Sequence, residues 1–140
     1  MILYEVFRLY SPATIIFRQT YKTMQLGNVI LPPGVQLALP ILFIHHDPDI
    51  WGPDATEFKP TRFAEGISKA TKDGQLAFFP FGWGPRICIG QNFALLEAKM
   101  GLSMILQHFK FELSEKYQHA PYIVMTIHPQ YGAPIKFHRV

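Results

Sequence analysis

The strongest constraint on this chain is a ten-residue run, Phe81–Gly90, that contains its single cysteine, Cys88. No disulfide can form within a chain that has one cysteine. Three glycines lie in this run, Arg86 lies two residues before the cysteine, and an apolar helical pattern begins two residues after it. Metals bind the thiolate rather than the thiol, and a thiolate is favoured near a cation and at a helix N-terminus. The run therefore indicates a cysteine presented to a bound metal.

A lone cysteine is more commonly a small buried hydrophobic residue, but the residues around Cys88 argue against that interpretation. The run matches Phe-x-x-Gly-x-Arg-x-Cys-x-Gly at every fixed position. This pattern resembles the haem-binding signature of the cytochrome P450 family. The resemblance implies a haem b whose iron is bound axially by the thiolate of Cys88, which pushes electron density onto the iron and favours O–O cleavage.

Four neighbours of Cys88 receive cofactor-binding roles on the same grounds. Gly84 permits a turn, and Gly90 lets the backbone approach a flat ligand closely, since neither has a Cβ atom. Phe81 is placed to cover the sulfur. Arg86 carries a permanent charge and five donors suited to a carboxylate, and the resemblance implies a haem propionate as its partner. The alternative for Arg86 is an exposed, solubilising side chain.

An acid and a base lie three residues apart in the first predicted helix, residues 1–10. Glu5 and Arg8 share one face of that helix, a spacing that usually means only a surface ion pair. The cytochrome P450 family carries a buried Glu-x-x-Arg pair at this place before its cysteine signature. The resemblance implies that Arg62, in the stretch Phe58–Phe63, completes a Glu5–Arg8–Arg62 network that orients the core behind the haem. Such a network is structural, and losing Arg8 should damage folding and haem uptake together.

Two further cofactor contacts are expected from resemblance. Arg18, in a predicted strand over residues 14–20, is similar in its offset to a second propionate-binding arginine of the family, with a solvent-facing strand arginine as the alternative. His45 lies in a His-His-Asp-Pro stretch that resembles the family's His-Arg-Asp-Pro stretch, with His46 in place of the arginine. We reject a metal site at the adjacent histidines because neighbouring side chains diverge and no other ligand stands at the right spacing.

Periodicity and turn residues predict short elements around these motifs. Residues 21–26 and 29–31 form a predicted hairpin with its turn at Gly27-Asn28, residues 35–39 a strand, and residues 41–46 a short helix. Residues 65–75 are predicted to form a surface loop. Residues 90–109 are predicted to form a helix, which is apolar nearly all round and hence expected to be buried. The predicted edge strands are residues 110–113, 122–128 and 134–138. The predicted fold class is α+β, mainly α, the C-terminal haem-binding part of the cytochrome P450 fold with small β-sheets.

Composition excludes several classes of protein. Apolar residues make up 49% and aromatic residues 14%, which argues against disorder. The net charge of +3 comes from scattered residues, so no nucleic-acid partner is expected. The first ten residues lack the pattern of a signal peptide, and the most apolar stretch, residues 37–44, is interrupted by Pro40 and is too short to cross a bilayer.

We interpret residues 1–140 as a C-terminal fragment of a cytochrome P450 domain. The N-terminal anchor, the substrate loops and the central oxygen-activating helix of the family have no counterpart in the sequence, and Met1 falls where an internal methionine of a longer protein would stand. A truncated gene product or gene model is therefore expected. The full-length parent is expected at the endoplasmic reticulum membrane on its cytosolic face. The amino-acid sequences of Ile87–Ala94 and Pro129–Pro134 look most like those of the plant secologanin-synthase-type group.

Two functions from different classes follow. The first is a haem-thiolate monooxygenase that inserts one oxygen atom from O2 into a small hydrophobic, terpenoid-like substrate, with a NADPH-cytochrome reductase as electron donor. The second is a catalytically inactive fragment that binds haem poorly or only interacts with a redox partner. A cysteine-nucleophile enzyme is disfavoured because no histidine stands in a recognisable partner motif.

Overall fold

The computed structural model describes residues 1–140, which form two compact units, Met1–Pro80 and Phe81–Val140. The boundary lies directly before the cysteine run, at a place where composition shows no linker. The elements of the first unit are α1 (Ile2–Leu9), β1 (Ile16–Gln19), β2 (Met24–Leu26), β3 (Val29–Leu31), β4 (Gln36–Leu39), α2 (Ile41–His46) and α3 (Pro48–Trp51), followed by short 3-10 turns at Pro60–Phe63, Ile67–Lys69 and Lys72–Gly74. Helices and small sheets together confirm the predicted α+β class.

Helix α1 is amphipathic in an unusual way, because its buried face carries two charged residues. Glu5, Arg8 and Leu9 are buried, while Ile2 and Val6 are exposed. The helix ends at Leu9, three residues before Pro12, which could not continue it. Helical spacing therefore predicted the element correctly, but hydrophobicity alone did not identify the buried face.

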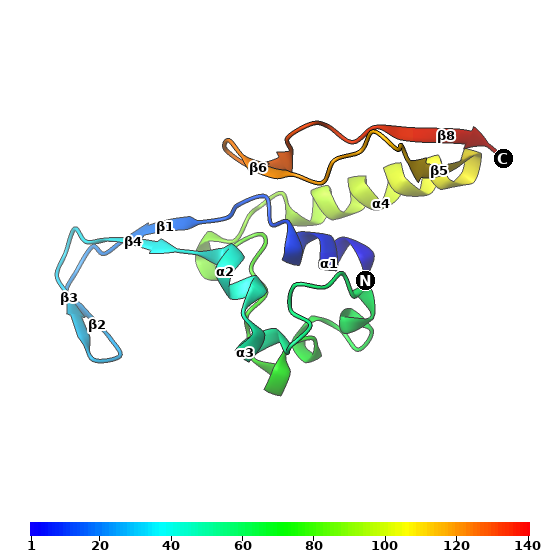
Figure 1. Ribbon diagram of the computed structural model, residues 1–140. Coiled ribbons are helices and arrows are strands. Elements are labelled where there is room, and N and C mark those ends of the chain that lie inside the picture. The colour runs from blue at the N-terminus through cyan, green and yellow to red at the C-terminus, as the bar shows by residue number, and fades with distance from the viewer. The chain divides into compact units, whose positions relative to one another are not determined.

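The four strands of the first unit form two antiparallel pairs, one nested within the other. β1 pairs with β4, and the β2–β3 hairpin is inserted between them along the chain. Figure 1 shows this hairpin at the far end of the β1–β4 pair from α2. Gly27 and Gly34 have positive φ angles of 58° and 86°, conformations that glycine adopts without a Cβ clash. The predicted hairpin and its two flanking strands are thus confirmed, with β1 shorter than predicted.

The hydrophobic core of the first unit is aromatic. It consists of Trp51, Ala55, Phe63, Ala70, Ala77 and Phe78, with Tyr4, Phe7, Ile44, Ile50 and Ile67 packed against it. The rings of Phe63 and Phe78 lie 5.1 Å apart and tilted, a geometry favoured by aromatic pairs. The polar stretch 65–75, predicted as a surface loop, is mostly exposed but contributes the buried Ala70 and Thr71.

The second unit contains a 3-10 turn at Gly84–Arg86, α4 (Gln91–His108), β5 (Phe109–Leu113), β6 (Pro121–Ile123), β7 (Ile127–Pro129) and β8 (Ile135–Arg139). β5 pairs with β8, and the β6–β7 hairpin lies between them along the chain. The single strand predicted over 122–128 is wrong, because the chain reverses at Val124–Thr126. No glycine, proline, asparagine or aspartate marks that reversal.

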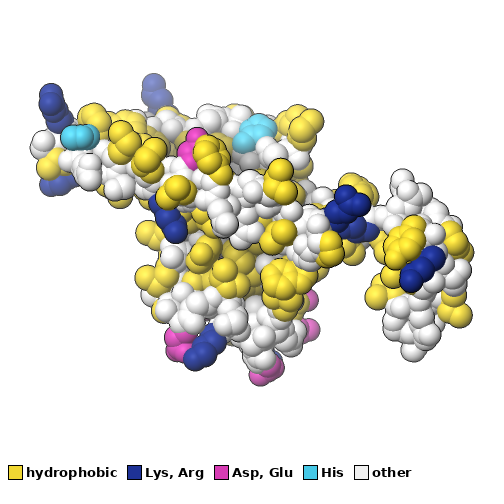
Figure 2. Space-filling view, turned by 180° about the vertical axis from the view of Figure 1, so that it is seen from behind, with side chains coloured by type: hydrophobic (Ala, Val, Ile, Leu, Met, Phe, Trp, Pro, Cys, Tyr) yellow, Lys and Arg dark blue, Asp and Glu magenta, His cyan; other side chains and the backbone are white.

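Helix α4 has nearly the predicted limits, but its predicted burial is wrong. None of its residues is buried, and Phe93, Leu96, Met100 and Met104 are all exposed. A helix that is apolar all round needs cover on every side, and the second unit offers it only short two-stranded sheets. Figure 2 shows that hydrophobic side chains are plentiful on the surface of the molecule.

No helix of the chain combines the length and the apolar character needed to cross a membrane.

Candidate functional site

Cys88 lies on a loop that closes just before helix α4. Its N–H donates to the carbonyl of Phe81 (2.9 Å), and its own carbonyl accepts from the N–H of Gln91 (3.3 Å), the first residue of the helix. The cysteine is exposed and free. The loop thus holds the backbone of the cysteine at both sides and leaves the thiol open to a ligand.

Glycines give this loop its path. Gly82 and Gly84 have positive φ angles of 76° and 74°, which residues with a Cβ rarely adopt. A Cβ on Gly90 would meet the Sγ of Cys88 at 3.8 Å, an ordinary contact distance. Gly84 is therefore required by conformation, whereas nothing within the chain itself requires a glycine at position 90.

The surroundings of the thiol suit a flat, apolar group that carries carboxylates. Trp83, Ile87 and Ile89 are exposed, and the side chain of Ile89 has no cover at all. Arg86 is exposed, and no hydrogen bond or ion pair within the chain occupies its guanidinium. A soft thiolate suits the iron of a haem, exposed apolar side chains suit its macrocycle, and an unpaired cation suits its carboxylates.

A second cluster, in the first unit, is centred on Arg8, which has no exposed surface. Its Nε and Nη2 donate to the two carboxylate oxygens of Glu5, both at 2.9 Å. Its Nη1 donates to the carbonyls of His45 (2.6 Å) and Ala55, and Nη2 also reaches the carbonyl of Glu57 (3.2 Å). All five N–H donors of the guanidinium are thus satisfied, as a buried arginine requires.

Glu5 is the acceptor that makes this burial possible. Its Oε1 also accepts from the N–H of Lys59 (2.9 Å) and lies 3.6 Å from the Nε of Arg62. Burial alone would raise the pKa of Glu5, but the hydrogen bonds from Arg8 and Lys59 and the charges of Arg8 and Arg62 hold that pKa below its ordinary value. The structure therefore brings Glu5, Arg8 and Arg62 together, as the sequence predicted.

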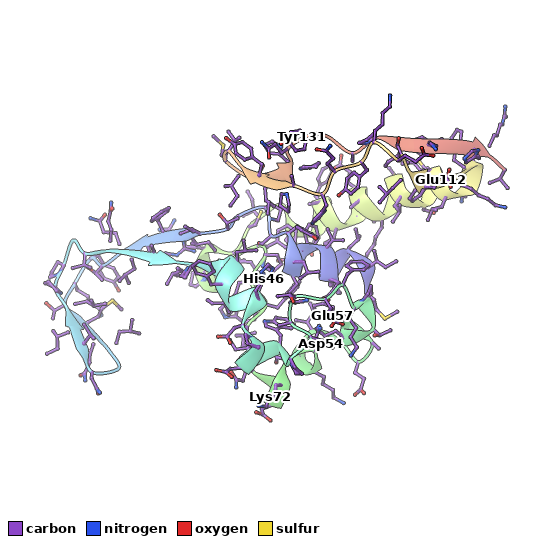
Figure 3. The ribbon with its side chains drawn as sticks, in the orientation of Figure 1. His46, Asp54, Glu57, Lys72, Glu112 and Tyr131 are labelled. Atoms are coloured by element: carbon purple, nitrogen blue, oxygen red, sulfur yellow. The ribbon has the colours of Figure 1, made fainter.

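Arg62 ties the cluster to the segment after α3. Its Nη1 donates to the carbonyl of Trp51 (2.8 Å) and lies 3.0 Å from the carboxylate of Asp54, and its Nη2 donates to the carbonyl of Asp54 (3.0 Å). Lys59 also donates to Asp54 at 2.7 Å, and these two cations lower the pKa of Asp54 to about 2. Figure 3 shows Asp54 and Glu57 on this segment. Sequence reasoning missed Asp54, because a single partly buried acid has no signature of its own.

Arg18 and His45 differ in their burial and in their hydrogen bonds. Arg18 lies half-buried on β1 and donates to the carbonyl of its neighbour Phe17 (2.9 Å), so its predicted propionate contact stays a prediction. His45 has no exposed surface, and its Nε2 accepts from the N–H of Phe79 (2.9 Å). The ring of His45 therefore has no exposed surface, and its expected contact with the cofactor stays a prediction.

Comparison with known proteins gives one answer. The Cytochrome P450 family model matches residues 1–132. Cytochrome P450 CYP72A616 of Paris polyphylla is 66% identical over all 140 residues, and 11-oxo-beta-amyrin 30-oxidase of Glycyrrhiza uralensis is 62% identical over the same length. The chain covers 27% of each of these two relatives.

A solved structure gives the same result for the fold. Retinoic acid bound cyanobacterial CYP120A1 superposes with a TM-score of 0.87 at 31% identity, over 99% of this chain and 32% of that protein. The cofactor of such proteins is a haem ligated by a cysteine, and this chain has one cysteine to offer.

Proposed function

Because this chain belongs to the cytochrome P450 family, we propose that it forms the cysteine-ligand side of a haem-thiolate monooxygenase. The observation that carries this proposal is the exposed thiol of Cys88 on its glycine-bounded loop, beside the unpaired Arg86. The reaction inserts one oxygen atom from O2 into an organic substrate. When bound, the haem supplies the activation of dioxygen, and the protein supplies ligand, orientation and electrostatics.

Each residue of the loop has a defined task in this proposal. Cys88 holds the iron through its thiolate, while its N–H already donates to the carbonyl of Phe81, so the backbone at the cysteine is fixed before a ligand arrives. Arg86 binds a propionate, and Arg18 is a candidate for the second one. Phe81 shields the sulfur from water, and Gly90 leaves room for the macrocycle. The buried Glu5–Arg8–Arg62 network keeps its structural role in the first unit.

The proposed substrate is a small hydrophobic molecule of the terpenoid class. This finer assignment is supported by the relatives named 11-oxo-beta-amyrin 30-oxidase in Glycyrrhiza uralensis and Medicago truncatula, at 62% and 60% identity. Electrons would come from a NADPH-cytochrome reductase, as is typical of the family. We place the full-length parent at the endoplasmic reticulum membrane on its cytosolic face.

A second candidate function concerns the chain by itself: it binds haem poorly and is catalytically inactive. The exposure of α4 and of the rim around Cys88 favours this alternative, because water then competes with the cofactor on the surfaces that should hold it. The chain spans about a quarter of the length of its named relatives.

The experiment that tests the proposal is an absorption spectrum of the purified chain mixed with haem, reduced and exposed to carbon monoxide. A red-shifted Soret band, characteristic of thiolate-ligated ferrous haem, is expected for the native chain and should be absent from Cys88→Ser. An unchanged band in Cys88→Ser would refute the ligand assignment. No haem-dependent band in the native chain would favour the inactive-fragment alternative.

A further inference from the structure

We propose that His45 is a positioning residue for the cysteine loop: its neutral ring holds the backbone that enters the loop, while its carbonyl holds Arg8. The inference rests on the proposed function for its consequence at the haem, but not for its structural part. It replaces the expected cofactor contact of His45 with an action through the protein backbone.

The first observation is the hydrogen bond between the ring and the chain. The N–H of Phe79 donates to the Nε2 of His45 over 2.9 Å, across 34 positions of sequence. Only Pro80 lies between Phe79 and Phe81, and the ring of this proline restricts the backbone. The carbonyl of Phe81 accepts the N–H of Cys88. One short, stiff piece of backbone therefore links the residue that His45 holds to the residue that holds Cys88.

The second observation fixes the chemical form of the ring. An N–H donor points at Nε2, so this nitrogen must be the unprotonated acceptor and the proton must lie on Nδ1. Nδ1 is buried and has no hydrogen-bond partner. A buried donor without a partner is unfavourable, so the fold keeps a costly histidine where an apolar residue would pack without that cost. The bond to Phe79 is what a histidine adds here.

The third observation shows why the ring cannot move. His45 stacks on Phe78, with ring centres 5.5 Å apart and planes 25° apart, and meets Trp51 edge-on at 6.3 Å. Its main-chain carbonyl accepts from Arg8 (2.6 Å). A single residue of α2 thus connects the Glu5–Arg8 network through its backbone and the entry to the cysteine loop through its side chain.

Matched substitutions can test this role. The side-chain oxygen of His45→Gln can reach the place of Nε2, whereas that of His45→Asn is too short to do so. His46→Gln makes the same chemical change one residue along α2, where Nε2 contacts the carbonyl of Leu9 (3.0 Å) instead. Figure 3 shows His46 on α2.

The primary measurement is amide hydrogen exchange on the chain without haem. In His45→Asn, we expect the amides of Phe79 and Cys88 to exchange faster by about tenfold or more, while His45→Gln stays within about threefold of the native chain, as loss of one buried hydrogen bond predicts. His46→Gln should leave both amides unchanged. Equal exchange in His45→Asn and His45→Gln, or faster exchange at Phe79 without any change at Cys88, would overturn the proposal.

Spectra separate this inference from the proposed function. With haem and carbon monoxide, His45→Asn should show a smaller fraction of the thiolate-type band than His45→Gln, and Cys88→Ser should show none. If the native chain gives no thiolate band while the amide results hold, the monooxygenase proposal fails for this chain and the positioning role of His45 stands. If the native band is present and unaffected by His45→Asn, the positioning role fails.

Discussion

The two units of this chain differ in the kinds of side chains that they bury and expose. In Met1–Pro80, charged groups lie inside: Glu5 and Arg8 are fully buried beside an aromatic core. In Phe81–Val140, Gly82 is the one buried residue, and large apolar side chains such as Ile89 and Phe93 face outward. Both units nonetheless share one strand plan, an antiparallel pair with a hairpin inserted between its strands.

This difference shows that strand pairing does not depend on the formation of a hydrophobic core. Hydrogen bonding between neighbouring strands forms the nested hairpin in each unit, with a glycine turn at Gly27 in the first unit and no turn residue in the second. A core needs surfaces that close on one another, and the first unit closes its own around Trp51, Phe63 and Phe78. The second unit presents its apolar residues around a cysteine loop, where the proposed cofactor would cover part of them.

The largest effect should come from breaking the buried ion pair. Arg8→Met leaves the carboxylate of Glu5 buried without its main partner and should destabilise the first unit by about 3–5 kcal/mol, measured by urea unfolding. Lys69→Met is the control, because it breaks the exposed pair with Glu65 and should cost less than about 1 kcal/mol. Similar losses in the two variants would contradict the comparison between buried and exposed charge.

Equivalent truncations in the two units should have unequal effects. Ile41 is 3% exposed, and Ile41→Ala should lower the free energy of unfolding by about 2–5 kcal/mol. Ile89 is fully exposed, and Ile89→Ala should change it by no more than about 0.5 kcal/mol. The check is denaturant unfolding of both variants, and a comparable loss in Ile89→Ala would mean that the second unit has a core of its own.

Acid should destabilise the first unit through His45. Burial, aided by the charges of Arg8 and His46, lowers the pKa of His45 from 6.5 to about 4. As the pH falls through 6.5, the unfolded chain binds a proton that the folded chain refuses, so stability should drop by about 2 kcal/mol between pH 7 and pH 5. Glu5 and Asp54 have lowered pKa values, so their contributions are lost only below their ordinary values of 4.5 and 3.8.

His45→Gln removes this titration. Unfolding followed at several pH values should therefore give a flatter curve for His45→Gln than for the native chain. An equally steep decrease in both proteins would assign the acid sensitivity to other groups.

The smallest expected effect concerns two glycines of the second unit. Gly84→Ala places a Cβ at a φ of +74° and should cost about 1–2 kcal/mol, which corresponds to roughly tenfold weaker haem binding in a spectral titration. Gly101→Ala lies in the open interior of α4 and should instead favour the helix by about 0.5–1 kcal/mol, visible as more helical circular dichroism. Equal haem affinities in the two variants would show that the loop path is not set by Gly84.

Much of the chain could be predicted from sequence because the signals are local. Helical spacing located α1 and α4, and Gly27-Asn28 located the first hairpin. The second hairpin was missed, since its reversal at Val124–Thr126 carries no turn residue. The buried ion pair of the first unit, Glu5–Arg8, was predicted from the family resemblance rather than from physical chemistry, because Glu-x-x-Arg on a helix ordinarily indicates a surface pair.

The sequence by itself determined the family, the single metal-ligand candidate Cys88 and the turns at Gly27-Asn28 and Gly84, because each depends on residue types at fixed spacing. Only the tertiary structure decided where the charges and rings lie. It placed His45 against Phe79 and gave Arg8 five acceptors. Three of these acceptors are the backbone carbonyls of His45, Ala55 and Glu57, which no local pattern connects to Arg8. Burial is a property of surfaces that meet in space, so the same apolar spacing yields a core in one unit and an exposed helix in the other.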